Sequence, residues 1–103
     1  EGSNPKDGPS AGISITTAIL SHIKNKKISD EISMTGEITL KGDILKVGGI
    51  KEKSIACFRN KIKTLYIPEE NKNDINWLEK DLKESIEFIP IGNYEELFKK
   101  IFD

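Results

Sequence analysis

A helix-start signal within the first ten residues is the strongest constraint on how this chain can fold. Pro9 suits the first helical position, because its missing N–H would have no intrahelical partner there. Four apolar residues follow at spacings of four: Ala11, Ile15, Ile19 and Ile23. Such spacing predicts an amphipathic helix from Pro9 to about Lys24, with this row of side chains as its apolar stripe.

Short strand patterns follow this helix. Ile32 and Met34 alternate with polar residues, and residues 38–47 (ITLKGDILKV) predict two short strands joined by a turn at Lys41-Gly42-Asp43. Residues 63–67 predict another strand, which Pro68 would stop. Residues 85–91 predict a last strand, for which Pro90 favours an edge position.

Further helices are predicted between and after these strands. One runs from Ile50 to about Asn60; one side carries Ile50, Cys57 and Phe58, and the opposite side carries Glu52 and Arg59. A short helix from Asp74 to about Leu82 would be capped by Asn73 or Asn71, and residues 71–73 are the expected exposed loop. Tyr94 to Phe102 predicts a closing helix with Leu97, Phe98 and Ile101 facing inward. Strands and helices mixed in this way indicate an α+β (mixed α/β) domain.

The composition excludes several classes of protein. With 103 residues the chain fits one domain, and 16 basic against 17 acidic side chains argue against a nucleic-acid or membrane-surface role based on bulk charge. The single cysteine, Cys57, cannot form an internal disulfide, so a reducing compartment is expected. No apolar run approaches the roughly 20 residues of a membrane-spanning helix, and the first residues do not resemble a signal peptide. Because few residues precede the first motif, we expect that an upstream part of the protein is missing.

A candidate nucleophile stands at the start of the first predicted helix. Residues 8–12 (GPSAG) match the G-x-S-x-G pattern, which places Ser10 at the positive end of the helix dipole. Free backbone N–H groups around Gly8 to Ser10 could stabilise an oxyanion there. A serine at this position can also serve only as a helix cap. An α/β-hydrolase elbow further requires a preceding strand and a later acid and histidine, and neither condition is met.

If Ser10 is a nucleophile and histidine is excluded, lysine is the remaining common base. His22 lies twelve residues after Ser10 on the same predicted helix, about 18 Å along its axis, and Cys57 reads as a small core residue. A lysine base requires its pKa to fall from about 10.4 toward neutrality, which needs burial. On the helix after Gly48-Gly49, Lys53 falls between Ala56 and Cys57, and Lys51 between Ile55 and Phe58. The helical wheel leaves both lysines open, and either could instead be a solvated side chain.

Four stretches in order, EGSNPKDGPSAG, MTGEITLKG, VGGIKEK and IPEEN, together resemble the proteolytic domain of the Lon family of ATP-dependent proteases. The resemblance runs from Glu1 to the end of the chain and implies the ribosomal protein S5 domain 2-like fold. It implies a Ser-Lys dyad with Ser10 as nucleophile and Lys53 as base. It also implies that Thr35 orients the lysine amine and that Asp7 lines the site. Lys46 departs from the proline of many members, at a position that supplies no chemistry.

The resemblance further implies that residues 1–103 are the C-terminal portion of the peptidase domain, without its upstream half or the ATPase module. No G-x-x-x-x-G-K-[ST] phosphate loop is present, so ATP and magnesium are expected in the full-length enzyme and not in this segment, and no metal site is expected here. The family implies a hexameric ring that degrades damaged, misfolded and regulatory proteins in bacterial cytoplasm or the mitochondrial matrix. The isolated chain is expected to fold with an incomplete groove and to be inactive.

A second function is compatible with the same fold. Glycine-rich loops before helices also bind phosphates, and kinases of the galactokinase and homoserine-kinase type resemble this fold. The alternative is therefore a ligand- or phosphate-binding or assembly module without proteolysis. The phosphate loops of these kinases carry more glycine and serine than residues 5–12 (PKDGPSAG), which favours the peptidase interpretation.

Overall fold

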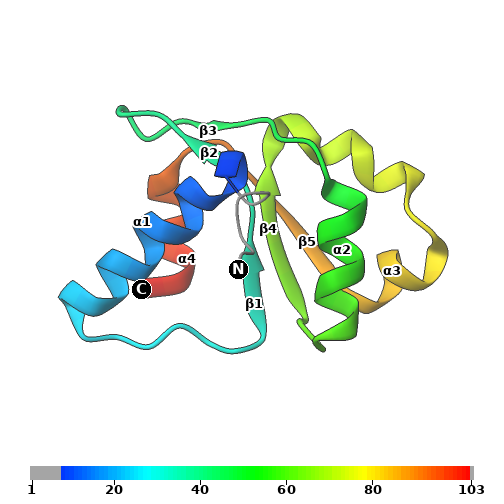
Figure 1. The fold of residues 1–103 in the computed structure, drawn as a ribbon, viewed down its shortest axis with the longest axis horizontal. Helices are drawn as coiled ribbons and strands as arrows, with labels where there is room; N and C mark the ends of the chain where they lie inside the picture. Colours follow the sequence, from blue (N-terminus) through cyan, green and yellow to red (C-terminus); the bar gives the residue numbers. More distant parts are fainter. Residues whose placement is uncertain (1–7, 103) are drawn as a thin grey trace.

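A computed structural model of the chain describes residues 8–102, with side chains from Gly12 onward (Figure 1). Its elements in chain order are α1 (Gly8–Lys24), β1 (Ile32–Met34), β2 (Glu37–Ile38), β3 (Ile44–Leu45), α2 (Ile50–Arg59), β4 (Thr64–Pro68), the 3₁₀ helix η2 (Glu69–Trp77), α3 (Lys80–Ser85), β5 (Glu87–Ile91) and α4 (Tyr94–Phe102). The predicted mixture of helices and strands is confirmed.

The strands form two separate units. β1, β4 and β5 make a parallel sheet in the order β1-β4-β5, and β2 and β3 make an antiparallel hairpin. β5 lies at an edge of the parallel sheet, as Pro90 predicted. A turn joins the hairpin strands as predicted, but it spans Thr39 to Gly42, because Gly42 N donates to Thr39 O at 2.9 Å, and Asp43 instead forms a bridge with Asn93.

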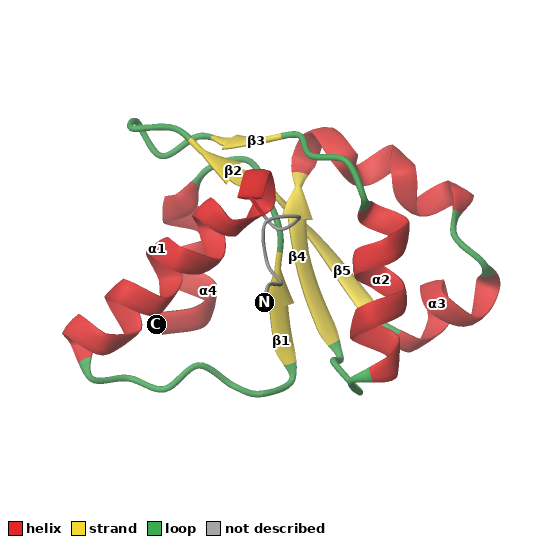
Figure 2. Ribbon diagram, in the orientation of Figure 1, coloured by secondary structure: helices red, strands yellow, loops and turns green. Residues whose placement is uncertain are grey.

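Helices cover both faces of the parallel sheet (Figure 2), with α1 and α4 on one side and α2 and α3 on the other. The alternation of side chains along β4 divides the core accordingly. Tyr66 belongs to the cluster that contains Ile13 and Leu97, whereas Leu65 and Ile67 belong to the cluster that contains Ile50 and Cys57. A parallel strand buried on both faces explains why residues 64–68 lack a polar side.

The predicted apolar stripe of α1 is wrong, although the helix itself is confirmed. Ile15, Ile19 and Ile23 are 57%, 54% and 70% exposed. The buried side chains are instead Ile13 and Thr17, with Leu20 half-buried beside them. α1 therefore has apolar residues on two faces, and the packing of α4 and the sheet decides which face is buried.

The segment after β4 also differs from the prediction. A single helix was expected over residues 74–82, but the chain forms η2 and then α3, with Leu78 buried between them. Asn71 was expected in an exposed loop or as a helix cap, yet its side chain is fully buried. Phe58, expected on the buried side of α2, is 48% exposed, whereas Ile50 and Cys57 are buried as predicted.

Candidate functional site

The two candidate lysines of α2 lie in different environments. Lys53 is half-buried, whereas Lys51 and Glu52 are exposed. Since α2 turns about 100° per residue, positions 51 and 53 lie on different faces, and position 53 shares its face with buried Cys57 one turn later. Burial thus separates two lysines that the helical wheel left equivalent.

The start of α2 is fixed by backbone geometry and by a buried amide. Gly49 precedes the helix with φ of 78°, a conformation that glycine adopts without strain. The first intrahelical hydrogen bond runs from Lys53 N to Gly49 O at 2.9 Å. Just upstream, the Asn71 side chain accepts from Val47 N at 3.0 Å and donates to Val47 O at 2.8 Å. The segment that leads into the Lys53 helix is therefore anchored to η2.

Cys57 lies beneath the Lys53 side of α2. Burial raises the pKa of the Cys57 thiol, an effect that the nearby Lys53 cation and a hydrogen bond from Ser33 partly oppose. A thiol whose pKa is raised is a poor nucleophile. Cys57 is confirmed as a small core residue, and Lys53 has a buried polar neighbour on its own helix.

Of the remaining sequence candidates, only Thr35 has a described side chain. Thr35 directly follows this strand; it is 3% exposed, and its backbone N donates to Tyr66 O at 3.0 Å. Ser10 lies in the first turn of α1, together with Gly8 and Pro9, and its side chain lies outside the described set. Asp7 lies outside the described residues altogether.

The carboxyl ends of the parallel strands are where these segments meet. α1 and α2 both begin at that end of the sheet (Figure 1), and Thr35 follows β1 there. In open sheets of parallel strands, functional sites lie at the carboxyl ends, where loops and helix N-termini converge. Positions 10, 35 and 53 thus all lie toward the same end of the parallel sheet, on segments far apart in the chain.

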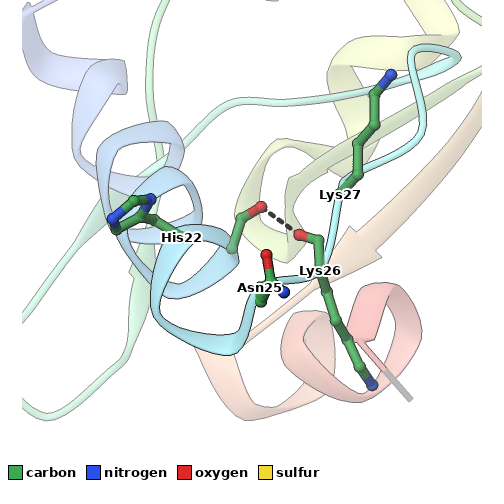
Figure 3. Close-up of a pocket in the computed structure, with 5 residues that line it drawn as sticks. His22, Asn25, Lys26 and Lys27 are labelled. Carbon is green, nitrogen blue, oxygen red and sulfur yellow. Dashed lines mark hydrogen bonds between the residues drawn. The ribbon is translucent and has the colours of Figure 1, made fainter.

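His22 lies at the opposite end of α1, where it is exposed. It lines a shallow surface depression with Ser21, Asn25, Lys26 and Lys27 (Figure 3). The Ser21 hydroxyl donates to Lys26 O within this depression, and Lys26 Nζ donates to Phe102 O at 2.9 Å. These contacts tie the end of α1 to the end of α4, away from the strand ends that carry Thr35.

Comparison with known proteins identifies the family of this chain. The family model for the Lon protease (S16) C-terminal proteolytic domain matches residues 1–103. The chain belongs to the Lon family. It is 47% identical over 102 residues to the Lon protease of Mycoplasmopsis agalactiae and 50% identical over 102 residues to that of Mycoplasma mobile. A mitochondrial Lon protease homolog from Ostreococcus lucimarinus is 45% identical over 102 residues.

These Lon relatives are much longer than this chain. The matches cover 99% of the chain but 10%, 12% and 11% of the three relatives. The family match confirms the resemblance over residues 1–103, and residues 8–102 confirm the expected α+β fold. Both bacterial and mitochondrial proteins occur among the relatives.

Membrane-spanning helices and metal-ligating clusters can be assessed for the described residues, 8–102. These residues contain no helix of a length and apolarity that could cross a membrane. They also contain no group of three or more histidine, cysteine, aspartate or glutamate side chains that could hold a metal ion.

The structure adds two residues that sequence reasoning missed in this Lon-family domain. Asn71 stands in the IPEEN stretch, which was noted as part of the resemblance but was given no role. Tyr94 was noted only as the start of the last helix, yet its hydroxyl lies 2.6 Å from the Thr17 hydroxyl. For the contact between Tyr94 and Thr17, the one available sequence signal was that Thr17 stands in the middle of an apolar row.

Proposed function

We propose that this chain carries the Ser-Lys dyad of a Lon-type serine endopeptidase, with Ser10 as nucleophile and Lys53 as base. The observation that carries the assignment is the half-burial of Lys53 beside Cys57, in contrast to the exposure of Lys51. A lysine base needs partial exclusion from water, and only one of the two candidates has it. Membership in the Lon family supports the same pair.

The reaction proceeds through an acyl-enzyme. Neutral Lys53 Nζ takes the proton of the Ser10 hydroxyl, whose oxygen attacks the peptide carbonyl. Backbone N–H groups at the start of α1 stabilise the oxyanion; Pro9 has none, so Gly8 and Ser10 are the donors available there. Protonated Lys53 then gives its proton to the leaving amine, and water, activated by the same amine, releases the acyl group.

Thr35 and Asp7 have supporting roles in this proposal. Thr35 orients the Lys53 amine; its near-complete burial at the end of β1 and its backbone bond to Tyr66 would keep its position fixed. Asp7, which directly precedes α1 in the chain, would line the site. Residues 1–103 form the C-terminal portion of the peptidase domain, and the rest of the substrate groove comes from upstream sequence.

The whole protein, by this proposal, is an ATP-dependent protease that assembles as a hexameric ring and degrades unfolded or damaged proteins. The named relatives are Lon proteases, and this chain matches about a tenth of their length. The 103 residues contain no phosphate loop, so ATP and magnesium would bind elsewhere in the longer protein. The bacterial cytoplasm or the mitochondrial matrix is its proposed location.

Paired substitutions in the full-length protein test the dyad. Ser10→Ala and Lys53→Ala should each abolish hydrolysis of a fluorogenic peptide and labelling by a serine-directed phosphonate. Lys51→Ala is the matched control, because it removes an exposed lysine from the same helix turn and should retain activity. Hydrolysis that survives Ser10→Ala, or that is lost in Lys51→Ala and kept in Lys53→Ala, would reject the assignment.

A further inference from the structure

A buried directional contact between side chains restrains the rotation of α1 about its own axis. The Thr17 hydroxyl donates to Ile13 O at 2.8 Å and lies 2.6 Å from the Tyr94 hydroxyl. A threonine hydroxyl has a single proton, so Tyr94 is the donor to Thr17. Both side chains are buried, and 77 residues separate them in the chain.

The other contacts of α1 restrain its rotation less. Among its described side chains only Ile13 and Thr17 are fully buried, while the row from Ile15 to Ile23 is exposed. The backbone contact from Ile13 N to Gly36 O is long, at 3.4 Å. Burial of Ile13 and Leu20 decides which face of α1 meets the core, but apolar burial is not directional. The Tyr94–Thr17 hydrogen bond adds a directional restraint on the rotation.

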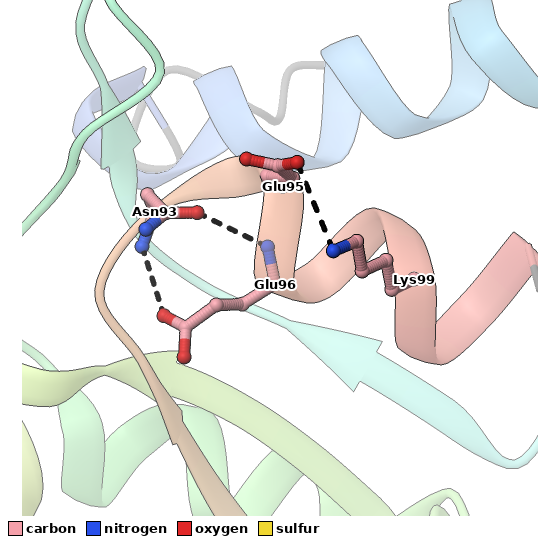
Figure 4. Close-up of polar contacts among 4 residues, drawn as sticks. All are labelled: Asn93, Glu95, Glu96 and Lys99. Carbon is pink, nitrogen blue, oxygen red and sulfur yellow. Dashed lines mark hydrogen bonds and ion pairs between the residues drawn. The ribbon is translucent and has the colours of Figure 1, made fainter.

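Tyr94 is itself held rigidly. Its backbone N donates to Gly42 O of the hairpin turn at 2.7 Å. A reciprocal cap fixes the start of α4, because Glu96 N donates to Asn93 Oδ1 and the Glu96 carboxylate accepts from the backbone of Gly92 and Asn93 (Figure 4). The Tyr94 hydroxyl is therefore carried toward α1 by a backbone that is itself held in place by hydrogen bonds.

Position 10 lies on the same face of α1 as position 17. Seven residues at 3.6 per turn leave the two positions about 20° apart and about 10.5 Å along the axis. A rotation of the helix at Thr17 therefore moves the backbone of Ser10 by the same angle. We infer that Tyr94 is a positioning residue for Ser10 that acts through Thr17. The inference rests on the proposed role of Ser10 as nucleophile.

The test uses the full-length protein and substitutions that remove one hydroxyl. Tyr94→Phe keeps the aromatic ring. Tyr94→Phe and Thr17→Val should each lower kcat for peptide hydrolysis, and the rate of phosphonate labelling, by about tenfold, because small misplacements of a nucleophile are costly. KM should stay within twofold, and the double variant should be no slower than either single one. Thr17→Ser keeps the hydroxyl and should restore kcat to within threefold of the parent.

Tyr66→Phe is the matched control, because it removes the same oxygen from the same apolar cluster. It should keep kcat within threefold. A kcat within threefold of the parent in both Tyr94→Phe and Thr17→Val overturns the inference, whatever their melting temperatures. An equal loss in Tyr66→Phe also overturns it, because the effect would then be general loosening of the core.

Either side of the hydrogen bond can be tested alone. If Tyr94→Phe does not fold, Thr17→Val and Thr17→Ser address the same bond from α1. The outcomes also separate the two proposals. Activity in Ser10→Ala refutes the dyad, whereas an inactive Ser10→Ala protein beside a fully active Tyr94→Phe protein refutes only the positioning role.

Discussion

The buried amide of Asn71 forms hydrogen bonds with both backbone polar groups of Val47. Its Oδ1 accepts from Val47 N at 3.0 Å, and its Nδ2 donates to Val47 O at 2.8 Å and to Asp74 Oδ2 at 2.7 Å. The amide thus replaces a strand partner for the segment between β3 and α2. Because that segment leads to Lys53, the contact links the stability of the domain to the placement of the proposed base.

Asn71→Leu should lower the free energy of unfolding of the 103-residue chain by about 3 kcal/mol or more. The substitution leaves two backbone groups of Val47 without partners, at roughly 1–3 kcal/mol for each buried unsatisfied group. Urea unfolding measures the change. Asn73→Leu, at an exposed position two residues away, should change stability by less than about 0.5 kcal/mol. Equal effects of the two substitutions would show that the hydrogen bonds between Asn71 and Val47 contribute nothing to stability.

Gly36→Ala should destabilise the chain by about 2–4 kcal/mol, through backbone strain and overpacking together. Gly36 has φ of 147°, and a Cβ there would lie 2.8 Å from Ile44 Cγ2. Gly48→Ala is the control, because a Cβ at Gly48 would meet no atom within 4 Å. It should be neutral or slightly stabilising. A Gly36→Ala chain that unfolds at the parent's urea concentration would contradict the packing at the end of β1.

Ile13→Ala and Ile19→Ala should differ strongly in stability. Ile13 is fully buried, so its truncation should cost about 2–4 kcal/mol. Ile19 lies in the exposed row of α1, so its truncation in the 103-residue chain should cost less than about 0.5 kcal/mol. Thermal unfolding of the two variants compares them directly. The helix periodicity alone predicts the opposite order, and a greater loss for Ile19→Ala would restore that prediction.

The chain should lose stability as the solution becomes alkaline. Burial raises the pKa of the Cys57 thiol above its ordinary 9.0 and the pKa of the Tyr94 hydroxyl above its ordinary 10.0. The native state then keeps protons that the unfolded chain has released. This stabilisation is fully present below about pH 9 and is lost as the pH rises through the native pKa values.

Urea unfolding between about pH 8 and 10.5 measures this loss. The difference in unfolding free energy between the parent and Cys57→Ala should shrink with rising pH, beginning near pH 9, where the unfolded thiol ionises. The difference between the parent and Tyr94→Phe should shrink at higher pH, beginning near the ordinary pKa of tyrosine, 10.0. Differences that stay constant, or grow, across this range would contradict the burial of these groups.

Local patterns by themselves determined most helices and strands of this chain. Pro9 marked the start of α1, Gly48-Gly49 separated the hairpin from α2, and Pro90 placed β5 at a sheet edge. Such signals act within a few residues, through backbone geometry and missing donors, so they do not depend on distant partners. The motifs around Ser10 and Lys53 were likewise readable from the sequence, as was their resemblance to the Lon family.

Tertiary structure decided which faces are buried. α1 offers two apolar rows, and the row with Ile13 and Thr17 is the one that packs on the core, where the Thr17 hydroxyl meets that of Tyr94, 77 residues later. The buried Asn71 side chain satisfies the backbone N–H and C=O of Val47 with hydrogen bonds. A local sequence pattern does not reveal this contact. Burial also distinguished Lys53 from Lys51, which the helical wheel could not. In each case the deciding free energy comes from contacts between segments far apart in the chain, and periodicity along one segment carries no information about them.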